Sequence, residues 1–358
     1  MTIKKDKSEN FYDRMNALAK KHKFPGRVIF ELTYKCNFQC VHCYIAADKR
    51  KKELTTGQVF LILDQLKMAG SFHIWFTGGE LLLRKDIFGI FDYAKKCGFR
   101  ISILTNGSLI NKDTAKRIAS LGTSLNRVDI SVLGTTKKTF EKITGKTGSF
   151  ERVMKAIKSL KEEGVNVQIK ANLLSLNKDE FLGIKKLAER QKCFFGYDTS
   201  LIRRTDGSNA PLRYQVELKE AYRIKRLIDS NGGTINEKLF LKLKPNDMGR
   251  KKLFHCGVGE SEVAINPYGE MNFCLEIHYP EYNILETSFN DCWKRLKKLL
   301  GKIEIPEEYQ CNVCILVSSC PWCPAKAWLL KRNFFTCEEQ SKKIALAEAG
   351  FASSKLLI

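Results

Sequence analysis

The chain has 358 residues, of which 44% are hydrophobic and 28% are charged, so it can form a large core or two domains. Lys and Arg outnumber Asp and Glu by 61 to 39. The basic residues are spread over stretches such as 155–161 and 294–298, which indicates solvated helix faces and does not favour nucleic acid as a partner. No apolar run is long enough to cross a bilayer and the N-terminus lacks a secretory signal, so we expect a cytoplasmic protein without a membrane partner.

Residues 26–202 alternate short apolar runs with amphipathic stretches. The predicted strands are 28–32, 73–76, 100–104, 127–132, 165–172 and 194–201. The predicted helices are 55–69, 86–97, 111–121, 149–163 and 178–191, followed by 216–230. This alternation predicts an α/β fold, a partial (β/α)6 TIM-like barrel, with its chemistry in the loops after the strands.

The alternation ends after about residue 235. Beyond it lie scattered cysteines and one helical pattern at 288–300, which indicates a small domain held together by metal. We therefore divide the chain into an N-terminal extension (1–25), the barrel (26–235), a linker (236–255), a cysteine-rich domain (256–345) and a tail (346–358).

Thirteen cysteines in a reducing compartment indicate metal binding or catalysis rather than disulfides. Cys36, Cys40 and Cys43 lie in one loop directly after the first predicted strand, with the spacing CxxxCxxC. Three thiolates can bind three irons of a four-iron cubane and leave the fourth iron free for a small molecule. The alternative is a structural zinc site with a fourth ligand from His42 or elsewhere.

The CxxxCxxC loop resembles that of the radical S-adenosylmethionine (SAM) superfamily. The resemblance implies that the free iron binds SAM and that reductive cleavage yields a 5′-deoxyadenosyl radical. It implies SAM contacts from residues near or after successive strands, with Leu81 replacing a common proline. These residues are His42, Gly78, Gly79, Glu80, Asn106 and Ser131.

A second cysteine group contains two CxxC pairs separated by five residues, a strong metal signature for which zinc is the alternative. The group resembles the SPASM domain of radical SAM enzymes that mature peptides and proteins, although only two residues separate Cys320 from Cys323. The resemblance implies one auxiliary cluster on Cys311, Cys314, Cys320 and Cys337, and another on Cys256, Cys274 and Cys323.

The second of these clusters is short of one thiolate. We expect it to have a free iron or a ligand other than cysteine. Three further cysteines, Cys97, Cys193 and Cys292, are expected to pack as small apolar residues, and Cys292 is the best substitute ligand among them.

Together the two resemblances imply an enzyme that crosslinks, epimerises or oxidises a ribosomally made peptide or protein. A formylglycine-generating anaerobic sulfatase maturase ranks lower, because Leu275 stands where that family has an Asp. A non-catalytic iron–sulfur electron carrier is the alternative from another class, although carriers close their clusters. The catalytic acid or base is not assigned among Glu260, Glu276, Asp198 and Tyr197.

The implied partners are the peptide or protein substrate and a low-potential electron donor such as flavodoxin or ferredoxin. Residues 1–25 are too short for the peptide-binding domain that precedes the barrel in many peptide maturases. Recognition is therefore expected from the barrel, the cysteine-rich domain or a separate peptide-recognition protein.

Overall fold

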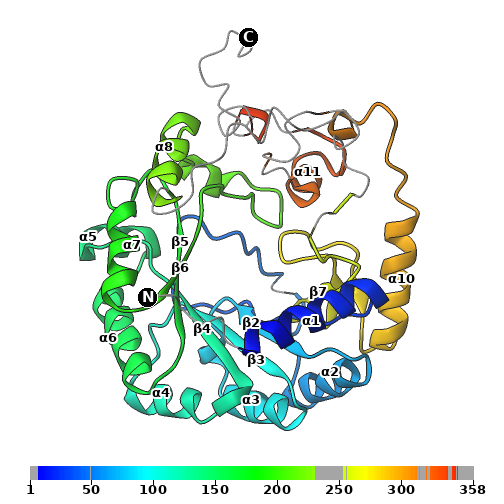
Figure 1. The fold of residues 1–358 in the computed structure, drawn as a ribbon, viewed down its shortest axis with the longest axis horizontal. Coiled ribbons are helices and arrows are strands. Elements are labelled where there is room, and N and C mark those ends of the chain that lie inside the picture. Colours follow the sequence, from blue (N-terminus) through cyan, green and yellow to red (C-terminus); the bar gives the residue numbers. More distant parts are fainter. Residues whose placement is uncertain are drawn as a thin grey trace.

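The computed structural model describes residues 7–48, 50–229, 253–254, 256–312, 314, 320, 323–337, 341–343 and 345. Its centre is one curved sheet with the strand order β6-β5-β4-β3-β2-β1-β7-β8-β9 (Figure 1). The parallel strands of the barrel are β1 (Arg27–Thr33), β2 (His73–Gly78), β3 (Arg100–Thr105), β4 (Leu125–Ser131), β5 (Val167–Asn172) and β6 (Phe194–Asp198). They are continued by β7 (Glu262–Ile265), β8 (Glu270–Asn272) and β9 (Tyr282–Asn283).

Helices cover the outer side of the barrel strands (Figure 1). They are α2 (Thr56–Met68), α3 (Ile87–Lys96), α4 (Lys112–Ala119), α5 (Lys137–Thr144), α6 (Ser149–Glu162), α7 (Phe181–Arg190) and α8 (Leu218–Asp229). The other long helices are α1 (Lys7–His22), α10 (Phe289–Gly301) and α11 (Pro324–Lys331). In Figure 1, α11 lies between α8 and α10, opposite strands β2 to β4.

Alternating side chains separate the two faces of the barrel strands. In β1, Val28, Phe30 and Leu32 are fully buried in the core on the helix side. Helix α2 contributes Val59, Ile62, Leu63 and Leu66 to the same core, and it begins at a capping box in which Thr55 and Gln58 exchange hydrogen bonds. The opposite side chains of each strand therefore face the interior of the barrel.

The six predicted barrel strands are confirmed, each within a few residues of its predicted ends. Helices α1, α5 and α11 were not predicted, and neither was the pairing of β7 with β1. These two strands are parallel, with Arg27 opposite Glu262 and Phe30 opposite Ile265. The cysteine-rich region thus shares the barrel's sheet, while most of the predicted linker lies outside the described residues.

Candidate iron–sulfur and SAM site

The loop with Cys36, Cys40 and Cys43 begins three residues after β1 ends, at the carboxyl edge of the sheet. Its outer side is held by α5, because the backbone N–H groups of Gln39 and Val41 donate to the carbonyls of Thr144 and Ile143 at 2.9 and 3.0 Å. The structure therefore brings the three predicted ligands into one anchored loop.

Several predicted ligands accept backbone hydrogen bonds at sulfur. Phe38 N donates to Cys36 Sγ at 3.4 Å, and Cys43, Cys274 and Cys323 each accept a backbone N–H from the residue two positions later. Such bonds stabilise a thiolate and tune an iron–sulfur cluster.

The three cysteines that were expected to pack do the reverse and donate their S–H groups to oxygen. Cys97 donates to Asp64 Oδ1 at 3.8 Å, Cys193 to the carbonyl of Gln191 at 3.5 Å, and Cys292 to the carbonyl of Thr287 at 3.3 Å. Cys292 is fully buried in the core, so its role as a substitute ligand is not supported.

The cysteine loop is the predicted site of a cluster, in which the three thiolates would bind separate irons. Among the described residues, no three His, Cys, Asp or Glu side chains are grouped as the ligands of one ion. Burial raises the pKa of all three thiols, that of Cys40 to about 12, so thiolates there need the positive charge of iron.

Gly78 and Gly79 bring the end of β2 against the cysteine loop. Gly79 N donates to the Thr33 carbonyl at 2.7 Å, and Gly78 has a φ of +137°. A Cβ atom would lie 2.2 Å from Thr33 O at Gly78 and 2.4 Å from Lys35 O at Gly79. The close approach that requires glycine is therefore to the loop's own backbone, while the predicted contact with SAM stays a prediction.

Glu80 joins the turn after β2 to the loop after β3. Its fully buried carboxylate accepts bonds from Thr105 Oγ1 at 2.8 Å, Asn106 N at 2.7 Å and Leu82 N at 3.1 Å. Burial raises the pKa of this carboxyl group, and the three donors oppose that shift. The side chain thus holds the loop after β3 in place, a role that its place in the Gly-Gly-Glu motif did not indicate.

Asn106 in turn braces the cysteine loop. Its Nδ2 donates to Asn37 Oδ1 at 2.8 Å and lies 3.9 Å from Cys36 Sγ. Asn37 Nδ2 donates onward to Ser108 Oγ at 2.9 Å. The predicted ribose contact therefore lies next to the first cluster ligand.

His42 and Ser131 are placed at the same edge of the barrel. His42 Nδ1 is buried without a hydrogen-bond partner, and burial lowers the pKa of the ring to about 4, which keeps it neutral. Ser131 ends β4 with an exposed side chain and lies opposite Lys170 of β5. Lys170 was missed from the sequence, but its position between buried Ile169 and Ala171 indicates that it faces the barrel interior.

A second missed feature is a buried polar cluster around Glu31. Tyr34 OH donates to Glu31 Oε2 at 2.8 Å and lies 3.1 Å from His278 Nε2. Burial raises the pKa of Glu31 to about 8. A glutamate within an otherwise apolar strand was the only sequence signal for this cluster.

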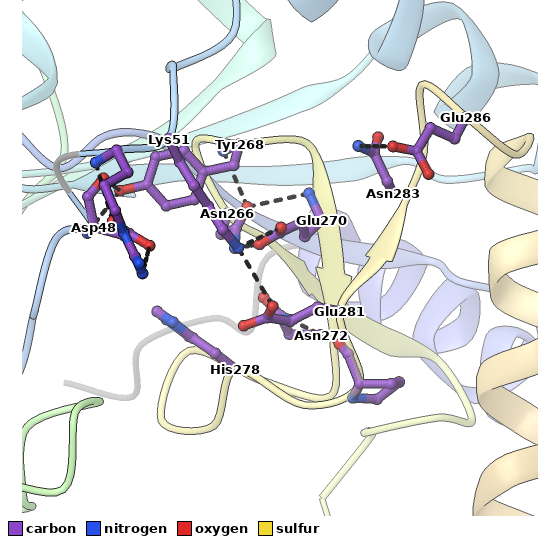
Figure 2. A network of polar contacts seen from close by, with 12 residues as sticks. Asp48, Lys51, Asn266, Tyr268, Glu270, Asn272, His278, Glu281, Asn283 and Glu286 are labelled. Atoms are coloured by element: carbon purple, nitrogen blue, oxygen red, sulfur yellow. Dashed lines mark hydrogen bonds and ion pairs between the residues drawn. The ribbon is translucent and has the colours of Figure 1, made fainter.

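A polar joint connects the segment after the cysteine loop to the β7–β8 hairpin (Figure 2). Lys51 Nζ lies 2.6 Å from Glu270 Oε1 and 3.3 Å from Glu281 Oε2. Tyr268 OH lies 3.0 Å from both the backbone N and the carbonyl O of Asp48. The joint adds side-chain contacts to the backbone pairing of β1 with β7.

The structure brings together more of the three-cysteine cluster than of the four-cysteine cluster. Cys323 interacts electrostatically with both Cys274 and Cys256, which places these three thiols near one another. In the four-cysteine set, Cys320 donates to the Ser341 carbonyl at 3.7 Å, and much of the chain between Cys311 and Cys323 lies outside the described residues. The ligand sets of both clusters stay predictions.

Comparisons with known proteins agree with this site. The family model described as the Radical SAM superfamily matches residues 30–189. The Fe-coproporphyrin III synthase of Methanosarcina barkeri is 33% identical over 174 residues, covering 47% of this chain and 43% of that protein. The match thus spans less than half of that relative.

Two further proteins match most of the chain. The mycofactocin maturase MftC of Mycobacterium tuberculosis is 28% identical, covering 87% of this chain and 80% of its own. Streptococcus suis SuiB, solved with the precursor peptide SuiA, has a TM-score of 0.70 at 16% identity, covering 93% of this chain and 80% of its own, and so has the same fold. Residues 30–189 thus form a domain of the radical SAM superfamily, with a [4Fe–4S] cluster and SAM as its cofactors.

Proposed function

We propose that this protein is a radical SAM enzyme that oxidatively modifies a ribosomally made peptide or protein. The observation that carries the proposal is the anchored CxxxCxxC loop, with N–H bonds to Cys36 and Cys43 and the Gly78–Gly79 backbone against it. When bound, the cluster and SAM supply a 5′-deoxyadenosyl radical that takes a hydrogen atom from the substrate.

The chain's own residues bind and orient these cofactors. Cys36, Cys40 and Cys43 would hold three irons, and the neutral ring of His42 would lie against the adenine. Asn106 and Ser131 provide polar groups for the ribose, and Lys170 offers a positive charge for the carboxylate of SAM. Gly78, Gly79 and Glu80 fix the loops that carry these groups.

A peptide substrate is supported by the likeness to MftC over most of the chain, and SuiB shows that this fold takes up a precursor peptide. A second candidate, a tetrapyrrole substrate, is favoured by the likeness to Fe-coproporphyrin III synthase and to the AdoMet-dependent heme synthase of Oleidesulfovibrio alaskensis, whose match covers 90% of this chain. The free thiols and the iron–sulfur cofactor fit the reducing cytoplasm as the compartment.

The proposal is tested by anaerobic reconstitution and measurement of 5′-deoxyadenosine after reduction with dithionite. We expect the native protein to release 5′-deoxyadenosine and Cys40→Ala to release none. Intact SAM with both proteins would refute the proposed enzyme activity. A precursor peptide encoded beside this gene and a panel of iron tetrapyrroles are then added separately. Faster release and a changed peptide mass support the first candidate, whereas porphyrin conversion supports the second.

We also propose that an acidic electron-donor protein such as flavodoxin docks over α5. Lys138, Lys142 and Lys146 are exposed, follow a four-residue spacing and form no ion pair among the described residues. Lys138 and Lys142 lie on α5 and Lys146 follows its end at Gly145. Like charges four residues apart destabilise a helix, so Lys138 and Lys142 do not serve helix stability. The three lysines border the turn at Gly145, where a Cβ atom would lie 3.1 Å from Gln39 O of the cysteine loop.

The docking proposal has a matched control. Lys294 and Lys298 have the same spacing on α10, which lies on the opposite side of the molecule from α5 in Figure 1. Reversing two lysines on either helix changes the net charge equally. Only the pair on α5 should slow reduction by flavodoxin, while reduction by dithionite stays unchanged in both variants.

A further inference from the structure

Glu276 carries a buried carboxylate oxygen that nothing in the described structure satisfies. It lies in the tight turn between Cys274 and Ile277, which form an isolated antiparallel bridge. Its Oε2 atom is buried and has no hydrogen-bond partner. Lys326, the cation that acts on it electrostatically, donates instead to Ser200 Oγ at 2.8 Å. An unpaired buried carboxylate costs several kcal/mol, so this position requires an explanation.

Glu276 lies beside predicted cluster ligands. Its carboxylate acts electrostatically on both Cys274 and Cys323, which places it near the two sulfur atoms. The backbone N–H groups of Glu276 and Ile277 also donate to the Cys274 sulfur, so the turn wraps around a predicted cluster ligand. A buried carboxylate oxygen without a partner among the described residues, in a turn whose N–H groups bind a predicted ligand, is placed to bind iron when the cluster is present.

The predicted cluster at this place lacks one ligand, because Cys256, Cys274 and Cys323 provide three thiolates for four irons. We propose that Glu276 is the fourth protein ligand of this auxiliary cluster and binds the remaining iron through Oε2. The inference rests on the auxiliary-cluster assignment within the proposed function. It makes the cluster a closed centre for electron transfer, so the substrate would not bind through this iron.

The test uses the holoenzyme reconstituted with ⁵⁷Fe and saturated with SAM, which occupies the free iron of the first cluster. Mössbauer spectra of the native protein and Glu276→Cys are compared. We expect about one iron in twelve to change from an oxygen-ligated to a sulfur-ligated signal, at unchanged iron content. Glu281→Ala is the control, since that carboxylate pairs with Lys51 at 3.3 Å and should leave the spectrum unchanged.

A second measurement covers the loss of the ligand. Glu276→Ala should expose one iron that binds added cyanide, detected by ¹³C coupling in the EPR spectrum of the reduced auxiliary cluster, and the native protein should bind none there. Identical spectra for the native protein and Glu276→Cys, or cyanide binding to the native auxiliary cluster, would overturn the proposal. An iron content near eight that Cys274→Ala does not lower would instead refute the cluster assignment itself.

Discussion

Replacing Glu80 should destabilise the fold even when no cofactor is bound. The carboxylate is fully buried and accepts from two backbone N–H groups and the Thr105 hydroxyl. Each hydrogen bond to a charged group contributes about 1.5–3 kcal/mol, and each buried donor left without a partner costs about 1–3 kcal/mol. Burying the Glu80 carboxylate also has a cost, which is seen in the raised pKa of this group. Glu80→Ala removes that cost.

Because these effects oppose each other, we expect Glu80→Ala to lower the free energy of unfolding by about 2–4 kcal/mol. Glu80→Gln keeps one acceptor oxygen but turns an NH2 group towards a backbone donor, so a loss of about 1–2 kcal/mol is expected.

The assay is urea unfolding of the metal-free protein, followed by circular dichroism. Glu189→Gln is the control, because Glu189 is exposed and its pair with Lys185 is long at 3.9 Å; we expect a change below about 0.5 kcal/mol. If Glu80→Ala unfolded at the same urea concentration as the native protein, the carboxylate would not hold the loop after β3.

Three further outcomes are expected. Gly79→Ala should lower the free energy of unfolding by about 1–3 kcal/mol in the same assay, because its Cβ would lie 2.4 Å from Lys35 O. The control Gly89→Ala in α3 meets nothing within 4 Å and should raise that free energy by up to about 1 kcal/mol. Equal effects of the two substitutions would contradict this prediction. Burial raises the pKa of Glu31 to about 8 from 4.5, so the folded state binds the proton more tightly and stability falls as pH rises between these values. Glu31→Gln should flatten that fall in unfolding measured at several pH values, and an unchanged slope would exclude Glu31 as its source. Lys142→Glu with Lys146→Glu should slow cluster reduction by flavodoxin about tenfold at low salt in stopped-flow absorbance and much less at high salt, and a salt-independent effect would argue against docking on α5.

Local pattern was sufficient to predict the barrel and the first cysteine loop. Strands such as β1 are short apolar runs with β-branched residues, and the loop's three cysteines lie within eight residues. Helix α5 was missed because its eight residues, KKTFEKIT, include two threonines and too few turns to establish a period. Its tertiary contacts, including buried Phe140 and Ile143, stabilise it.

Partners distant in sequence could not be predicted. Glu80 was read as a cofactor contact because its motif is local, whereas the groups that it binds lie 25 and 26 residues away. The pairing of β7 with β1 joins residues about 235 positions apart. The local sequence of neither strand indicates which strand it pairs with. Glu276 was one of four undistinguished acid–base candidates until the fold showed its unpaired oxygen beside Cys274.

The pairing of β7 with β1 also determines whether the two halves can be separated. β1 is a central strand, since β2 and β7 bond to its two edges. Removing the residues from 253 onward would expose the backbone N–H and C=O groups of β1 along one edge. It would also remove Glu270, the partner of Lys51 in the polar joint. We therefore expect residues 1–252 to aggregate on expression, measured as the soluble fraction against the full chain, although the barrel contains the whole first site. A soluble fragment that released 5′-deoxyadenosine would show that the sheet beyond β1 is dispensable and that the cysteine-rich half is an independent module.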